Sequence, residues 1–201
     1  MPIQIHSPFS IPFGRLEPEL GPIHFLGSPM RELAAQGGFP RVYIDPEENS
    51  AVTLDNVPAI FPVPAHACPT TRDPVNAVYS ICETLRTRCE LEGSHEHLFL
   101  TLYFDRVAVM AGTEPQRKAL LPLPKAHFCF PQKTVRVDFA FWTGRRFVAV
   151  FIDVARLQSG GAADEKLLRS SGFEVLRLRA DQIETRGLQS FLLRLEEIAN
   201  S

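Results

Sequence analysis

The sequence predicts a mixed α/β (α+β) domain with a central sheet flanked by helices. Alternating apolar residues, a Thr-Gly turn and a nearly continuous apolar run predict a β-hairpin over residues 134–154. A short helix with a glycine stop and a further strand follow this hairpin, and an amphipathic helix lies near the C-terminus. At 201 residues, of which 45% are hydrophobic, the chain is long enough for one sizeable core and a small appendage.

Residues 1–72 are rich in proline and are interpreted as an N-terminal extension or a small β-rich subdomain, with residues 73–201 as the main domain. Prolines inside short β-like runs favour edge strands and turns over the centre of a sheet. The elements predicted here are short strands at Arg41–Ile44, Ala51–Leu54 and Ala59–Val63 and a short helix at Pro29–Ala35.

The main domain is predicted to begin with a helix that starts at Asp73 and ends near Gly93. Asp is a good N-cap and the following proline suits the first helical position. Apolar residues recur at helical spacing through this stretch, so one face of the helix is expected to be buried. The apolar runs that follow are interpreted as strands at His97–Phe104 and Val107–Met110, and a short helix is predicted at Glu114–Leu121.

The hairpin is the most informative segment of the chain. In Thr134–Phe141 apolar residues alternate with others, which predicts one apolar face and one face that holds Arg136 and Asp138. A turn at Thr143 and Gly144 leads into Phe147–Val154, whose apolar character is typical of a strand buried on both faces.

The elements after the hairpin complete the predicted domain. A helix is expected at Asp164–Ser171, ended by Gly172, and a strand at Phe173–Arg179. The apolar positions of the C-terminal amphipathic helix are Leu188, Phe191, Leu192, Leu195 and Ile198.

Two acids of the hairpin point to a chemistry. Asp138 lies within the first strand and Asp153 closes the second, and carboxylates on adjacent strands can share a divalent cation that cuts a phosphodiester. Mg²⁺ keeps several waters and often takes only one or two protein carboxylates. Structural alternatives remain open: Asp138 could form a salt bridge to Arg136 or Arg145, and Asp153 could cap the turn after its strand.

The charge distribution favours a polyanionic partner. The segment from Pro115 to Phe147 holds seven basic residues and one acid, while the rest of the chain has 14 basic residues against 22 acids. A basic stretch around a lone carboxylate suits a nucleic acid that approaches a metal site, although solvated surfaces explain it equally well. The predicted nucleic-acid contacts are Lys133, Arg136, Arg145, Arg146 and Trp142, the last by stacking on a base, with plain packing as its alternative.

Several other classes of protein are not expected. No apolar run approaches the roughly 18–20 residues that span a bilayer, and the first residues lack the features of a secretory signal. The four cysteines form no CxxC pair, so they are interpreted as reduced thiols of a cytoplasmic protein. His66 with Cys68, and His95 with His97, fit no tight zinc-ligand spacing, so zinc is not expected.

Residues 73–199 resemble the PD-(D/E)XK nuclease superfamily. They are most similar to small bacterial proteins related to the very-short-patch mismatch-repair endonuclease. The stretches that carry the resemblance are VRVDFAF, FVAVFID and EKLLRSSGFEVLRLRADQI. The resemblance implies a restriction-endonuclease-like mixed sheet flanked by helices, here preceded by the proline-rich extension with its short strands.

The resemblance also implies a site. Asp138 takes the place of the metal-binding Asp, and Phe151 stands where many relatives have a glutamate. In the mismatch-repair branch a Phe occupies that position and a backbone carbonyl binds the metal, which implies Ile152 and Asp153 as the further metal-binding residues. The zinc-binding set of that branch has no counterpart here.

Two assisting residues complete the implied site. The acid near the start of the first helix in relatives is replaced by Asn76, and Glu83 is a candidate substitute two turns later. Lys166 is a candidate for a migrated charge-stabilising lysine, since the usual lysine is absent.

Two functions follow as expectations. The first is a Mg²⁺- or Mn²⁺-dependent DNA endonuclease, which the basic stretch and Asp138 favour. The alternative is a nuclease-fold protein without cleavage that serves as a DNA-binding or protein-assembly module, with a protein partner docking on the N-terminal extension. Asn76 and Phe151 favour this alternative.

Overall fold

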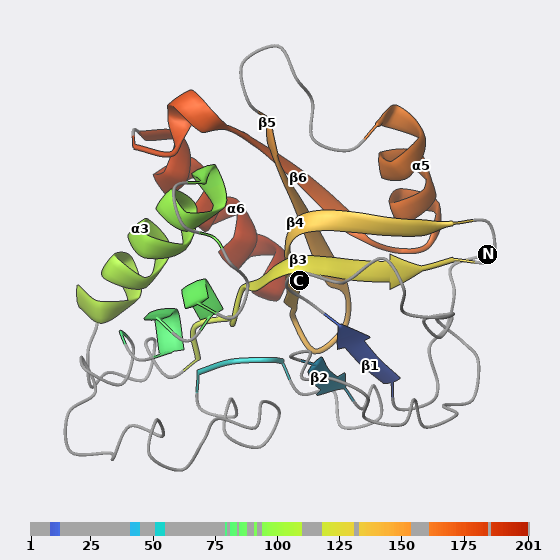
Figure 1. Cartoon of the computed structure of the whole chain (residues 1–201), viewed down its shortest axis with the longest axis horizontal. Helices are drawn as coiled ribbons and strands as arrows, with labels where there is room; N and C mark the ends of the chain where they lie inside the picture. The colour runs from blue at the N-terminus through green and yellow to red at the C-terminus, as the bar shows by residue number, and fades with distance from the viewer. Residues whose placement is uncertain are drawn as a thin grey trace.

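A mixed four-stranded sheet with flanking helices forms the centre of the structure, an α+β fold (Figure 1). The computed structural model describes residues 9–12, 41–44, 51–54, 79, 81–83, 85–87, 91, 94–109, 118–130, 133–153, 161–184 and 186–200. The sheet consists of β3 (Leu123–Cys129), β4 (Thr134–Trp142), β5 (Phe147–Asp153) and β6 (Glu174–Arg179), in that spatial order. β3 pairs antiparallel with β4, β4 pairs antiparallel with β5, and β6 runs parallel to β5.

The predicted hairpin is confirmed as β4 and β5. Its turn is closed by the Thr143 N–H, which donates to the Arg146 carbonyl over 3.2 Å. Gly144 has a φ of 91°, a left-handed conformation that glycine adopts at little cost. Every residue of β5 before Asp153 is buried, as its apolar sequence predicts.

The strand β3 has no counterpart among the predicted elements. It contains Pro124, which cannot donate to a ladder, so the sequence alone does not favour a strand here. The structure places β3 at the edge of the sheet, where a strand tolerates proline. The predicted helix at Glu114–Leu121 is wrong for its described part, because Lys118 lies in a turn and Leu120 forms a β-bridge with Thr53.

The predicted strands at His97–Phe104 and Val107–Met110 are wrong, because residues 95–109 form one helix, α3 (His95–Val109). Ser94 caps it by accepting a hydrogen bond from the His97 N–H over 3.1 Å. The buried side chains recur at helical spacing: Phe99, Leu100, Tyr103, Phe104, Val107 and Ala108. The uninterrupted apolar run concealed this period.

Helical conformation also occurs earlier, at Tyr79, 81–83 and 85–87, which confirms the described part of the helix predicted from Asp73. The Tyr79 hydroxyl donates to Asp105 of α3 over 3.0 Å and ties the two helical segments together.

Helix α5 (Ala162–Ser170) confirms the predicted helix and its glycine stop. Gly172 has a φ of 88°, and its N–H donates to the Arg169 carbonyl over 3.1 Å. Strand β6 follows, then a short 3₁₀ helix η2 (Ala180–Gln182) and the C-terminal helix α6 (Arg186–Asn200). The predicted apolar face of α6 is confirmed by the burial of Phe191, Leu195 and Ile198.

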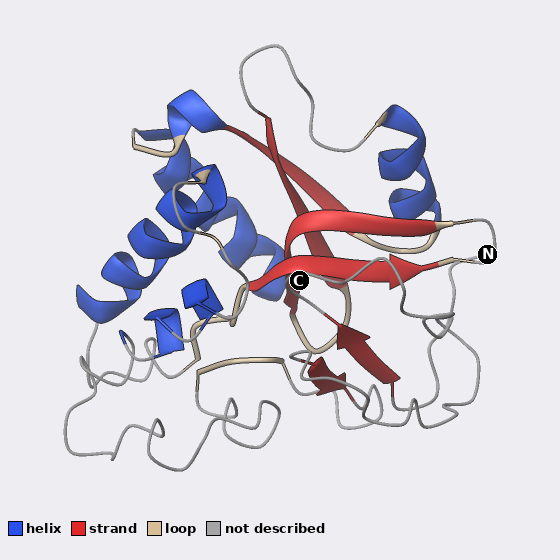
Figure 2. Ribbon diagram, viewed as in Figure 1, coloured by secondary structure: helices blue, strands red, loops and turns tan. Residues whose placement is uncertain are grey.

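The helices cover both faces of the sheet (Figures 1 and 2). The Phe99 ring of α3 lies 4.6 Å from Phe139 of β4 and 5.5 Å from Phe191 of α6, measured between ring centroids. Helices α3 and α6 therefore pack on the face that holds Phe139. Helix α5 contacts β6 through the hydrogen bond between Glu165 and Arg177, and Arg177 is the strand partner of Phe151. Phe151 points to the opposite face from Val150, which is the partner of Phe139, so α5 lies on the other face of the sheet.

In the N-terminal region, β1 (Phe9–Pro12) pairs antiparallel with β2 (Arg41–Ile44). The bounds of β2 are those predicted, whereas β1 was not predicted. The predicted strand Ala51–Leu54 reduces to a single bridge at Thr53. The predictions at Pro29–Ala35 and Ala59–Val63 lie outside the described residues.

Residues 51–54 nevertheless attach to the main sheet. The Val52 N–H donates to the Trp142 carbonyl over 3.1 Å, and the Val52 carbonyl accepts from the Leu121 N–H over 2.8 Å. The Val52 side chain is 1% exposed and belongs to the main core. Over the part of the chain that the structure describes, no helix is both long and apolar enough to cross a membrane.

Candidate functional site

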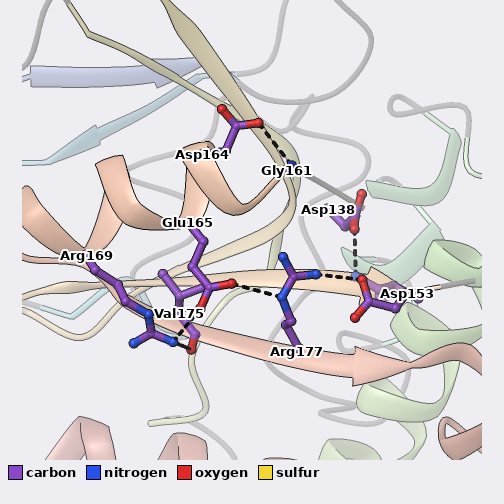
Figure 3. Close-up of polar contacts among 9 residues, drawn as sticks. Asp138, Asp153, Gly161, Asp164, Glu165, Arg169, Val175 and Arg177 are labelled. Carbon is purple, nitrogen blue, oxygen red and sulfur yellow. Dashed lines mark hydrogen bonds and ion pairs between the residues drawn. The ribbon is translucent and has the colours of Figure 1, made fainter. Parts of the chain in front are cut away.

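Asp138 is the only buried charged side chain among the described residues, with 4% of its surface exposed. Its Oδ2 accepts a hydrogen bond from the Ile152 N–H of β5 over 2.7 Å (Figure 3). A buried carboxylate is costly unless hydrogen bonds or an ion compensate for lost hydration. The carboxyl group of Asp138 is therefore held in place by the backbone of the strand that ends in Asp153.

This contact arises where β4 and β5 part. Their ladder ends at the pair Phe139 and Val150. In the same register Ile152 would face Val137, and its N–H would donate to the Val137 carbonyl. The Asp138 carboxylate takes that N–H instead. The Asp138 side chain thus replaces a backbone acceptor at the end of the β4–β5 ladder, and it binds the residue that precedes Asp153.

Asp153, at the end of β5, is held by an arginine of the neighbouring strand. An Nη1 of Arg177 lies 2.7 Å from Asp153 Oδ1, and the Asp153 side chain is only 14% exposed. Arg177 is the β6 partner of Phe151, and its guanidinium carbon lies 5.2 Å from the centre of the Phe151 ring. The predicted metal ligand Asp153 is therefore an ion-pair partner in this structure.

Glu165 of helix α5 is a third acid besides Asp138 and Asp153, and it completes a cluster around Arg177 that consists of Asp153, Glu165 and Arg177. Glu165 Oε2 accepts from Arg177 Nε over 3.0 Å, so one guanidinium bridges Glu165 and Asp153 (Figure 3). Arg169 donates to Glu165 Oε1 over 3.0 Å and to the Val175 carbonyl over 2.8 Å. Hydrogen bonds from Arg177 and then Arg169 hold the pKa of Glu165 below its usual value.

Neither of the two predicted assisting residues, Glu83 and Lys166, forms a hydrogen bond to this cluster within the part of the chain that the structure describes. Glu83 is exposed and accepts from Arg86 Nε over 2.8 Å, and this hydrogen bond lowers the pKa of the Glu83 carboxyl. Lys166 is exposed on α5, next to Glu165 in sequence. Among the described residues, no three or more His, Cys, Asp and Glu side chains gather in an arrangement that could hold a metal ion.

The predicted nucleic-acid contacts divide into two sets. Lys133 forms an ion pair with Asp164 at the start of α5, and Arg146 lies 3.5 Å from Glu174. Lys133, Arg136 and Arg145 all lie at exposed positions.

Trp142, the fifth predicted contact, is 3% exposed and packs 4.6 Å from the Phe147 ring. Packing, the alternative left open for this side chain, is therefore what the structure shows. A ring that is 3% exposed presents no face to a base in this conformation.

Two residues of the cluster were missed from the sequence, namely Arg177 and Glu165. Arg177 falls in the run EVLRLR, where a cation between buried Val175 and Leu178 requires a partner. The sequence therefore contained a signal for Arg177. Glu165 had none, since an acid in the first turn of a helix is common.

Comparisons of the chain with protein-family models, with curated proteins and with solved structures found no match.

Proposed function

We propose that this chain acts on DNA through a PD-(D/E)XK-type fold and that it hydrolyses phosphodiester bonds with a divalent metal ion at Asp138. The observation that carries the proposal is the buried Asp138 carboxylate at the point where β4 and β5 part, hydrogen-bonded to the Ile152 N–H. Burial of one acid in an otherwise apolar core is typical of a functional site.

The order of elements supports the fold part of the proposal. The resemblance implies a helix, a strand with the metal-binding Asp, an apolar strand ending in an acid, a helix, and the strand that contains VLR. The helix implied by the resemblance is the one predicted from Asp73, which is helical at residues 79, 81–83 and 85–87. After it the described chain has α3 and β3, then β4 with Asp138, β5 with Asp153, α5 and β6 in this order. β6 lies beside β5 and parallel to it, which requires the crossover that α5 lies on.

The oxygen donors at the end of the hairpin suit Mg²⁺ or Mn²⁺. Carboxylate and carbonyl oxygens are the ligands that these ions prefer, and zinc sites use His and Cys. In a strand the N–H and C=O of one residue point to the same neighbour, so the Ile152 carbonyl faces the Asp138 side. Asp138, the Ile152 carbonyl and Asp153 would hold the ion, provided that Asp153 exchanges its arginine partner for it.

A bound divalent ion would supply Lewis-acid polarisation of the phosphodiester and a more acidic water. The chain would contribute orientation and charge. Asp138 is fixed by Ile152, so its geometry is set before any ion arrives. Lys166 on α5 is exposed and would place positive charge near the developing negative charge on phosphate. Glu83 would assist only after the exchange of its Arg86 partner.

A cleavage assay tests the proposal. Purified protein with Mg²⁺ or Mn²⁺ should nick or degrade one of several DNAs: supercoiled plasmid, duplex, single-stranded, branched or mismatched. Asp138→Asn should lower the rate by on the order of 100-fold or more, because the metal contributes several kcal/mol to the transition state. The amide oxygen of Asn can still accept the Ile152 N–H, so the fold should persist.

Asp181→Asn is the matched control for this assay. Asp181 is an exposed acid that pairs with Arg179 just after β6, so its loss should leave cleavage unchanged. Failure of wild-type protein to cleave any of these DNAs in a metal-dependent manner would overturn the enzyme proposal.

A second function, DNA binding without cleavage, is favoured by one specific observation. Arg177 neutralises Asp153 and also engages Glu165, and the Phe151 ring lies against its guanidinium. An apolar ring and an arginine thus stand where an active site would offer further oxygen ligands. A protein partner at residues 1–72 stays a prediction. DNA binding that does not depend on metal, with no cleavage, is the result that supports this second function.

A further inference from the structure

The cluster around Arg177 places a positively charged guanidinium next to the acid Asp153, which is a proposed metal ligand. Arg177 places Nη1 2.7 Å from Asp153 and Nε 3.0 Å from Glu165, while its guanidinium carbon lies 5.2 Å from the Phe151 ring centre. The side chains of Arg177 and Glu165 are each 26% exposed and that of Asp153 is 14% exposed. Charges that are largely withdrawn from solvent are weakly screened, so they influence each other strongly.

A divalent ion that binds Asp153 must therefore displace Arg177 or share the carboxylate with it. Sharing places two cations within a few ångströms of each other and is unfavourable. We propose that Arg177 is a built-in cation that competes with the divalent metal for Asp153 and thereby sets the metal affinity of the site. This inference rests on the proposed metal site at Asp138 and adds a residue that controls it.

The geometry also provides for the exchange. Arg177 holds its two acids through different nitrogen atoms, so that it can leave Asp153 and keep its hydrogen bond to Glu165. The Phe151 ring lies against the guanidinium, and a cation over an aromatic face is favourable. Glu165 is in turn fixed by Arg169, whose other contact is the Val175 carbonyl of β6. Glu165 is thus a stationary anchor, and Arg177 is the residue that changes partner.

Direct titration of Mn²⁺ into the full-length protein by calorimetry tests the inference without any activity measurement. Arg177→Gln removes the competing charge, and the dissociation constant for Mn²⁺ should fall by about tenfold, the usual scale for residues that contact metal ligands. Arg177→Lys keeps the charge and should bind Mn²⁺ close to wild-type strength. Glu165→Gln removes the anchor of Arg177, so the arginine should hold Asp153 more firmly and Mn²⁺ should bind more weakly than to wild type.

Arg179→Gln is the matched control, because it removes one positive charge from the same strand two residues away. Arg179 is the β6 partner of Asp153, but its guanidinium is exposed and pairs with Asp181. Its loss should change the Mn²⁺ affinity little. Equal affinities for Arg177→Gln and Arg179→Gln would overturn the inference, since any gain would then be a general charge effect.

The role of Asp153 is tested by a second variant. Asp153→Asn should weaken Mn²⁺ binding, and in combination with Arg177→Gln it should abolish the gain. A gain that persists in the double variant would show that Arg177 acts elsewhere and would overturn the inference. Circular dichroism of each variant verifies the fold before titration, and Arg177→Lys carries the test if Arg177→Gln fails to fold: a tenfold gain in Arg177→Lys would contradict competition by charge.

The outcomes separate the inference from the proposed function. If wild-type protein cleaves DNA with metal and Arg177→Gln binds Mn²⁺ as wild type does, only the inference fails. If neither protein binds Mn²⁺, the proposed metal site and the inference fail together.

Discussion

At the scale of single residues, the guanidinium of Arg177 bridges two acids at the end of the hairpin, Asp153 and Glu165. Asp138 could be selected from the sequence because it is an acid inside an alternating apolar strand, and the structure finds it buried. Asp153 could be selected because it closes a strand that is otherwise almost wholly apolar. The sequence shows that Arg177 needs a partner, but its pairing with Asp153 could not be assigned, because the contact joins residues 24 positions apart and depends on the register of β5 and β6.

Arg136 and Arg145 are two of the predicted DNA contacts at exposed positions, and they carry a prediction at this scale. Substitution of either residue by Ala should weaken DNA binding similarly for all sequences and reduce the slope of log affinity against log salt by about one. Binding assays over a salt series measure this slope. Arg194→Ala removes an exposed arginine of α6 that pairs with Glu197 and serves as the control. Equal slopes for all three variants would exclude the basic stretch as the contact surface.

At the scale of elements, strands and helices were predicted well where local signals are strong. The hairpin, the helix with its Gly172 stop and the C-terminal helix have turn residues or clear periodicity. α3 was mistaken for strands because its apolar residues run together, although Ser94 at its N-cap was a usable signal. β3 was not predicted, because its proline argues against a strand in the centre of a sheet. Proline is tolerated in an edge strand, and the edge position of β3 depends on the whole sheet.

The attachment of α5 to the sheet leads to a prediction about pH. Hydrogen bonds from Arg177 and Arg169 lower the pKa of Glu165, so the ionised form stabilises the fold. This contribution is fully present above the unfolded-state pKa of about 4.3 and is lost as the pH falls through the lower folded-state pKa. Glu165→Gln should reduce the free energy of unfolding by about 1 kcal/mol near neutral pH.

Chemical denaturation of wild type and Glu165→Gln at several pH values measures this effect. The difference between the two proteins should shrink as the solution becomes strongly acidic, because wild-type Glu165 is then protonated. A difference that stays constant across the pH range would show that the ion bridge contributes nothing through its charge.

At the scale of the whole molecule, the relation between the N-terminal residues and the main domain is set by contacts that no local pattern reveals. The boundary between residues 72 and 73 was predicted from composition and stays a prediction. The structure adds that residues 51–54 form hydrogen bonds with Trp142 at the end of β4 and with Ala119 and Leu121, with Val52 in the main core. A boundary drawn from proline content therefore does not separate all the residues that belong to the main core.

Val52→Ala tests whether this attachment is part of one cooperative unit. The truncation leaves a gap in the core and should lower the free energy of unfolding of the main domain by about 1–3 kcal/mol. Thermal or chemical unfolding followed by two probes measures the change. Val109→Ala, at a position that is 80% exposed, is the control and should stay within about 0.5 kcal/mol of wild type. An unchanged main transition in Val52→Ala would indicate that residues 51–54 unfold independently.

The account depends most on whether Asp138 holds a metal ion. Crystals of the full-length protein grown with Mn²⁺ answer this directly, because the anomalous scattering of manganese identifies the ion. The account predicts manganese within about 2.0–2.6 Å of an Asp138 oxygen, with Arg177 moved from Asp153 to Glu165 alone. Absence of manganese at Asp138 in saturated crystals, with Arg177 still on Asp153, would contradict it.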